Sequence, residues 1–143
     1  MAKKNKTKRI FVVRFYKDYE HPENQDYKKK SPGEGYAMRI NEYAREMGKN
    51  LVAEFGCEDY FRYHIPPDYD AYLLHLANVS DIELLYLRKI RQDAWIYGIG
   101  ANGGDKSTTL EEMKEFGLDR LEKSFSEYFF REIIAQITSG PRR

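Results

Sequence analysis

The chain has 143 residues, of which 41% are hydrophobic and 15% aromatic, so it can form one globular domain with a core rich in Tyr and Phe. Its single cysteine excludes an intrachain disulfide, and no apolar run approaches the roughly 20 residues that a membrane-spanning helix needs. The apolar stretch behind the basic start is short and contains Arg14, which is atypical of a signal peptide, so we expect a cytoplasmic protein that does not contact a membrane.

Positive charge is concentrated at the start of the chain. The net charge is only +1, but residues 1–30 hold ten Lys and Arg against four Asp and Glu, and the remainder hold fourteen against nineteen. We expect residues 1–9 to be a basic flexible tail and residues 10–143 to form a single globular domain. Lysines with tyrosines nearby can neutralise phosphates and stack on bases, although lysine-rich tails also commonly just solvate a terminus. The candidate nucleic-acid-binding residues are Lys3, Lys4, Lys6, Lys8, Arg9, Lys28, Lys29 and Lys30.

Two short strands are expected in the first half of the domain. The β-branched and aromatic run at 10–16 predicts one strand, and residues 60–65 alternate in hydrophobicity before a Pro-Pro pair ends them. Between the two, apolar residues at helical spacing over 40–55 predict a helix that ends at Gly56. We expect the two strands to pair as a small antiparallel sheet near the N-terminus.

The second half of the chain is interpreted as helical. Residues 68–78 predict a short helix with an aspartate cap, and the capping box at 80–83 opens a helix that runs to Tyr97. A second capping box at 108–111 begins a final helix that bends near Gly117. Together these elements predict an α+β fold that is mostly helical, with four or five helices.

The end of the final helix carries a group of large apolar residues. They are interpreted as surrounding the helix, which implies burial on all sides by a partner subunit or by a central place in the bundle. We therefore expect a homo-oligomer, most simply a symmetric dimer. The group consists of Phe129, Phe130, Ile133, Ile134 and Ile137.

Four glycines within residues 97–107 form the segment best suited to bind a phosphate. The first three match the G-x-G-x-x-G spacing, in which glycines let the backbone approach a pyrophosphate. Because the preceding residues read as helix, a sharp connection between two helices is the other interpretation. An extended conformation of residues 93–97 would favour the interpretation of this segment as a ligand-binding loop. The candidate phosphate-binding residues are Gly98, Gly100, Gly103, Lys106 and Ser107.

The predicted helix over 80–97 has two patterned faces. We assign one stripe to the core: Ile82, Tyr86, Ile90 and Tyr97. The opposite side recurs at i, i+4, i+7 and i+11: Leu84, Arg88, Arg91 and Trp95. Trp and Arg are enriched at binding hot spots, so these four are candidate partner-binding residues. A helix buried in the middle of a bundle gives the same pattern.

The sequence contains no specific catalytic or metal signature. Cys57 and His64 lack the arrangement of a positioned nucleophile and base, and the histidines have no metal-ligand spacing, so we expect no cofactor and no metal. The favoured function is a small non-enzymatic regulatory or inhibitory protein that binds a protein or nucleoprotein partner. The alternatives are a nucleotide or phosphate-ligand binder that uses residues 98–107, and a nucleic-acid-binding protein that uses the basic N-terminal region.

Overall fold

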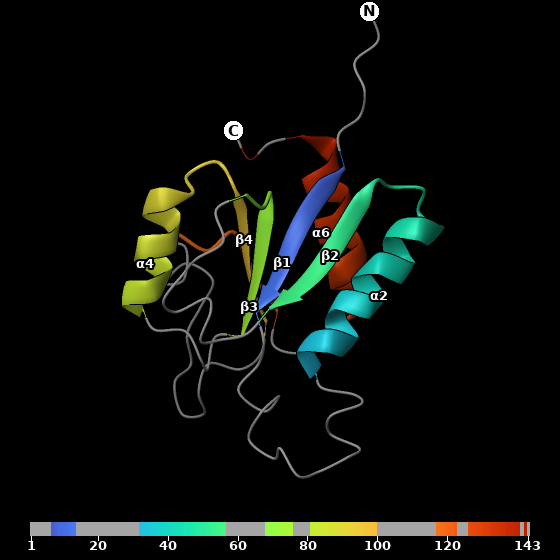
Figure 1. The fold of residues 1–143 in the computed structure, drawn as a ribbon, viewed down its shortest axis with the longest axis horizontal. Coiled ribbons are helices and arrows are strands. Elements are labelled where there is room, and N and C mark those ends of the chain that lie inside the picture. The colour runs from blue at the N-terminus through green and yellow to red at the C-terminus, as the bar shows by residue number, and fades with distance from the viewer. Residues whose placement is uncertain are drawn as a thin grey trace, which may run out of the picture.

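The fold is built on a sheet of parallel strands flanked by helices (Figure 1). A computed structural model describes residues 7–13, 32–56, 68–75, 81–99, 117–122, 126–140 and 142. Within these residues the elements are β1 (Lys8–Val13), α2 (Pro32–Glu46), β2 (Leu51–Gly56), β3 (Ala71–His75), α4 (Asp81–Ile90), β4 (Trp95–Ile99), β5 (Arg120–Glu122) and α6 (Glu127–Ser139).

The five described strands lie in the order β2-β1-β3-β4-β5, and every neighbouring pair is parallel. β1 pairs along its whole length with β2, from Lys8 opposite Leu51 to Val13 opposite Gly56. On its other side β1 pairs with the first residues of β3, and β3 pairs along its whole length with β4. This order is the flavodoxin-like arrangement of doubly wound α/β folds.

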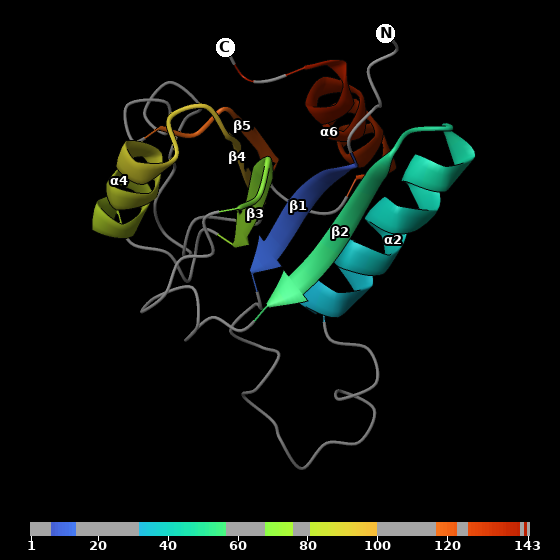
Figure 2. The ribbon, with the colours of Figure 1, turned by 45° about the horizontal axis from the view of Figure 1, so that its top comes forward.

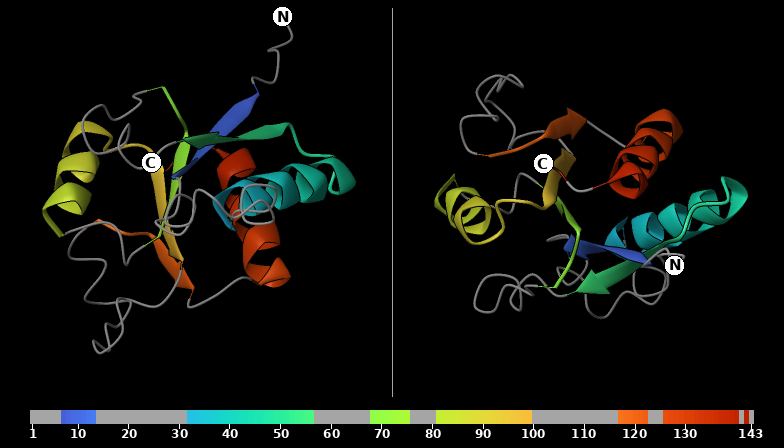
Figure 3. Two further views of the ribbon diagram at one scale, coloured as in Figure 1. Left: turned by 60° about the horizontal axis from the view of Figure 1, so that its bottom comes forward. Right: turned by 90° about the horizontal axis from the view of Figure 1, so that it is seen from above.

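Helices cover both faces of the sheet. α2 and α6 lie on one face and α4 lies on the other (Figures 2 and 3). Two hydrophobic cores result, one on each side of the strands. Side chains of β1 alternate between them: Ile10 and Val12 pack with α2 and α6, whereas Phe11 belongs to the core that contains residues of α4.

The predicted fold class is wrong. The described residues form an α/β fold with three helices and an all-parallel sheet, instead of a mostly helical fold with a small antiparallel sheet. The physical reason is burial on both faces, which replaces the alternating pattern of a half-exposed strand by a continuous apolar run. Residues 71–74 illustrate this, because all four are fully buried in β3 where we expected a short helix.

Two of the predicted helices extend too far. The helix expected over 40–55 ends at Glu46, where Gly48 adopts φ 69° and the amide of Lys49 donates to the carbonyl of Ala44. Gly48 therefore ends this helix instead of Gly56, which is the last residue of β2. The helix expected over 80–97 ends at Ile90, and the chain continues as β4.

Part of the bent final helix is also corrected. β5 occupies 120–122 within its expected span, and Gly117, with φ 95°, lies in a turn before this strand. α6 starts after Ser126, whose hydroxyl accepts a hydrogen bond from the amide of Phe129. The strand expected over 60–65 and the capping box at 108–111 lie outside the described residues.

The five large apolar residues of α6 are buried within this chain. Their spacing of i, i+1, i+4, i+5 and i+8 places them on one broad face of the helix, not around it. That face packs on the sheet and against α2. Burying these residues therefore needs no second subunit, and the expected dimer stays a prediction. Among the described helices, none has the length and apolar character to cross a membrane.

Candidate functional site

The carboxyl ends of the strands share one edge of the sheet, because all the described strands are parallel. The order of the strands reverses between β1 and β3, since β2 follows β1 on one side and the later strands follow on the other. Open α/β sheets bind ligands outside the carboxyl ends of the strands at such a reversal. The fold therefore defines a candidate ligand site before any side chain is considered.

The glycine-rich segment begins at this same edge. Gly98 is buried within β4, whose last described residue, Ile99, lies at the carboxyl edge and directly precedes Gly100 in the sequence. β4 neighbours β3, one strand away from the reversal. Of residues 93–97, Asp93 lies in a turn and Ala94 in a bend, and the last three are extended in β4, so the condition that we named for the ligand-binding interpretation is met in part. Gly100, Gly103, Lys106 and Ser107 lie outside the described residues.

The four candidate partner-binding residues do not share a helix face. Leu84 and Arg88 lie on α4, Arg91 lies just beyond its last residue, and Trp95 is the first residue of β4. Leu84 is buried in the core beneath α4. The expected spacing assumed a helix that continues to Tyr97, but α4 ends at Ile90, seven residues earlier. Their role in partner binding stays a prediction.

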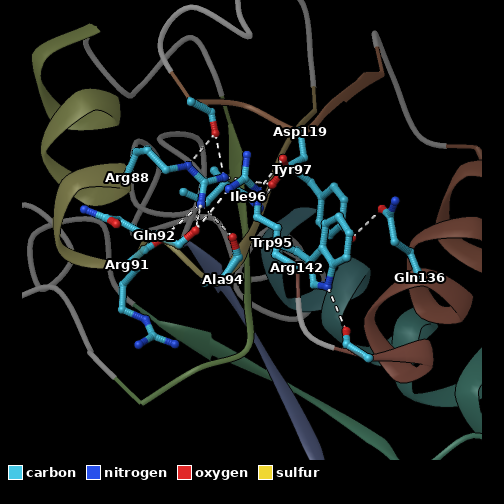
Figure 4. A network of polar contacts seen from close by, with 12 residues as sticks. Arg88, Arg91, Gln92, Ala94, Trp95, Ile96, Tyr97, Asp119, Gln136 and Arg142 are labelled. Atoms are coloured by element: carbon cyan, nitrogen blue, oxygen red, sulfur yellow. Dashed lines mark hydrogen bonds and ion pairs between the residues drawn. The ribbon is translucent and has the colours of Figure 1, made fainter.

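Arg88 is the centre of a polar network at the amino edge of the sheet (Figure 4). Its Nη1 donates to three carbonyl oxygens around the end of α4, those of Arg91, Gln92 and Ala94, at 3.0, 3.2 and 2.8 Å. Its Nε and Nη2 both donate to the carbonyl oxygen of Gly117, at 3.0 and 2.7 Å. One guanidinium thus joins the end of a helix to the turn before β5.

Asp119 supplies the negative charge of this network. Its Oδ2 accepts from Nη2 of Arg88 and from the backbone amide of Ile96, both at 2.8 Å. Its Oδ1 accepts from Nε of Arg142 at 2.8 Å. The side chains of Arg88 and Asp119 are only 15% and 12% exposed. Burial lowers the pKa of Arg88, and the negative charge of Asp119 opposes this effect. The arginine therefore stays protonated and forms an ion pair that is largely shielded from solvent.

Trp95 packs between β4 and the end of α6. Its ring stacks parallel to that of Tyr97, and its Nε1 donates to the carbonyl oxygen of Gly140 at 3.3 Å. The hydroxyl of Tyr97 donates to Oε1 of Gln136 at 2.7 Å. Arg91 donates from Nη2 to the carbonyl oxygen of Tyr69 at 2.7 Å. Trp95 and Arg91, which we predicted to bind a partner, thus make stabilising contacts within this chain.

Two residues of the stripe that we had assigned to the core, Tyr86 and Ile90, lie instead on an exposed face of α4, whereas Tyr97 is buried in β4 as expected. Tyr86 and Ile90 are 56% and 42% exposed, and Leu85 beside them is 46% exposed. Leu84 and Leu87 point to the sheet in their place. The buried side of α4 was misassigned because apolar residues occur on both sides of this helix, and the sequence offers no sign of which side meets the sheet. An exposed apolar helix face is a feature of protein interaction sites.

Two of the candidate nucleic-acid-binding residues, Lys8 and Arg9, are the first residues of β1. Arg9 donates from Nη2 to Oε1 of Glu54 at 3.1 Å and lies 4.2 Å from the centre of the Tyr69 ring. The hydroxyl of Tyr69 donates to the same Glu54 oxygen. Burial and this hydrogen bond raise the pKa of Tyr69 to about 12. Lys3, Lys4, Lys6, Lys28, Lys29 and Lys30 lie outside the described residues.

Comparison with known proteins adds no assignment. No protein family matches the chain, and no curated protein has a significant match to it. Within the described residues, no group of three His, Cys, Asp or Glu side chains is placed to hold a metal ion. The candidate site therefore depends on the topology of the sheet and on the sequence that follows β4.

Proposed function

We propose that the protein binds a small phosphate-containing ligand, of the nucleotide class, at the carboxyl edge of its sheet. The observation that carries this proposal is the strand order, which reverses between β1 and β3 at the edge where β4 runs into the glycine-rich segment. Doubly wound sheets with this order bind their ligands at that edge.

The composition of the segment after β4 suits a phosphate. Glycines let backbone amides approach the oxygens of a phosphate closely, and Lys106 adds a positive charge. The hydroxyl of Ser107 can donate a further hydrogen bond. The G-x-G-x-x-G spacing begins at Gly98, inside β4, so a strand lies on the amino side of the pattern, although the dinucleotide-binding pattern comes immediately after its strand.

A thermal-shift panel of ATP, ADP, NADH, NADPH and inorganic phosphate tests the proposal, followed by calorimetric titration of any stabilising compound. A ligand at one hundred times its Kd stabilises the folded state by about 2.7 kcal/mol, which raises the Tm by on the order of 10 °C. Lys106→Ala should weaken binding, and Lys89→Ala serves as the matched control because Lys89 is exposed on α4. A panel without any stabilising compound would reject the proposal.

A second candidate function is regulatory binding of a protein partner, and the exposed stripe of Leu85, Tyr86 and Ile90 favours it. Such a stripe suits an apolar surface on the partner. Tyr86→Glu should reduce capture of a partner by the immobilised protein. Tyr128→Glu is the matched control, since Tyr128 is a 71% exposed tyrosine on α6. Equal capture by both variants would remove α4 as the interaction surface.

A further inference from the structure

β2 is an edge strand of the described sheet, and its outer side carries peptide groups that β1 does not pair. An edge of this kind is a template for pairing with another extended chain. β2 is six residues long, whereas β5 at the opposite edge has only three. Very short edge strands resist pairing by themselves, so β2 is the edge that needs protection.

The side chain of Asn41 covers the middle of this outer side. Its Nδ2 donates to the carbonyl oxygen of Ala53 at 3.2 Å, and the amide of Ala53 donates to its Oδ1 at 2.8 Å. A carboxamide offers one donor group and one acceptor, as a peptide unit does. The side chain of Asn41 therefore occupies both backbone positions that a neighbouring strand would use at Ala53.

The next outward amide of β2 is also used within the chain. Residues of a strand direct their peptide groups alternately to its two neighbours, so Leu51 and Ala53 point to the same side. The amide of Leu51 donates to the carbonyl oxygen of Lys49 at 3.2 Å. α2 lies along β2 (Figure 2), which places Asn41 beside the strand. Both amides are thus paired without a further strand.

We propose that Asn41 blocks the edge of β2, and that without its carboxamide β2 pairs with β2 of a second copy. Antiparallel pairing about a two-fold axis at Ala53 would set Ala53 against its own copy and Leu51 against Phe55. Leu51, Ala53 and Phe55 are alternate residues of β2, so their peptide groups all point outward. In this pairing each of them would meet a complementary peptide group of the second copy. The product is a dimer with one continuous sheet across both chains.

The variant Asn41→Leu tests the proposal, because leucine has the same branched arrangement of side-chain heavy atoms and no hydrogen-bonding group. Light scattering after size-exclusion chromatography, over a dilution series, should show twice the wild-type mass at high concentration. Hydrogen exchange gives a local measurement. At low concentration the amide of Ala53 should exchange about tenfold faster than in the wild type, as expected for loss of one hydrogen bond of ordinary net strength. Association should slow it again.

Glu42→Leu is the matched control, since it adds the same apolar side chain at an exposed neighbouring position of α2. It should keep the wild-type mass and the wild-type exchange rate. If Asn41→Leu does not fold, Asn41→Ala serves instead, because alanine removes the whole carboxamide and so leaves both the amide and the carbonyl oxygen of Ala53 without this partner. A folded variant that keeps the wild-type mass at every concentration overturns the proposal, as does unchanged exchange at Ala53.

Discussion

Replacing Arg88 by methionine removes the side chain that joins the end of α4 to the turn before β5. Arg88 donates six hydrogen bonds, five to backbone carbonyl oxygens and one to Asp119. Methionine replaces the apolar stem of the arginine side chain and has no hydrogen-bond donor. The change therefore tests the polar contacts more than the packing.

The expected loss of folding free energy is about 3 kcal/mol. Breaking a buried ion pair by removing one partner costs about 3–5 kcal/mol when the other charge is left alone. Asp119 keeps Arg142 and the amide of Ile96, so the lower end of this range applies. The carbonyl oxygens of Gly117 and Ala94 lose close donors, which adds to the cost. The total free energy of unfolding of a domain of this size is about 5–15 kcal/mol, so a loss of about 3 kcal/mol is a large part of it.

Urea unfolding measures this loss, with the fluorescence of Trp95, the single tryptophan, as the probe. Arg91→Met is the matched control: Arg91 donates to Tyr69 at 2.7 Å, and its charge lies 3.7 Å from the largely exposed Asp93. We expect Arg91→Met to cost about 1 kcal/mol. If Arg88→Met costs no more than Arg91→Met, the network does not hold the amino edge together, and the reasoning is refuted.

Three further predictions concern single contacts. Gly117→Ala should cost at least about 2 kcal/mol, because φ is 95° there and the added Cβ would lie 2.7 Å from Cβ of Arg88; an unchanged urea midpoint would contradict this. Gly56→Ala should cost about 1–3 kcal/mol, since the added methyl would overlap the buried ring of Phe11, and calorimetry should show a lower Tm. The raised pKa of Tyr69 stabilises the folded state fully below its ordinary value of 10.0, and this contribution is lost as pH rises to about 12. Tyr69→Phe should therefore lose less stability over that interval than the wild type, and parallel losses in both would show that Tyr69 titrates normally.

The sequence predicted those elements whose patterns are local. The strand at 10–13 and the helix over 40–46 are confirmed, and α4 begins at Asp81 inside its capping box. The burial of the apolar residues of α6 is confirmed as well. In each case a local pattern decides between alternatives without reference to the rest of the chain: a run of β-branched residues, a capping box or the helical spacing of apolar residues.

The parallel strands could not be recognised in this way. In β3 and β4 nearly every residue is buried, so neither strand alternates, and both fit a helical spacing equally well. A parallel sheet depends on pairing between distant segments, such as β1 with β2, which one sequence does not reveal. The choice of Gly56 as the end of a helix shows the same ambiguity, since Gly48 was available eight residues earlier.

The candidate site was predicted in part. The glycine-rich segment was singled out, and an extended approach to it was named as the feature that would favour a ligand. The role of Arg88 was missed because its spacing with Trp95 assumed one continuous helix. Asn41 gave no signal, since an asparagine within a helix is unremarkable until β2 is known to lie beside it.

The first described strand, β1, lies inside the described sheet, between β2 and β3, and this position has a consequence for synthesis. A ribosome makes β1 first, but its two neighbours follow about forty and sixty residues later. Its core residues cannot be covered on both faces until α6, the last described element, has left the ribosome. Folding of this core is therefore delayed until α6 has been made, and a fragment released earlier presents Ile10 and Val12 to chaperones or to other nascent chains.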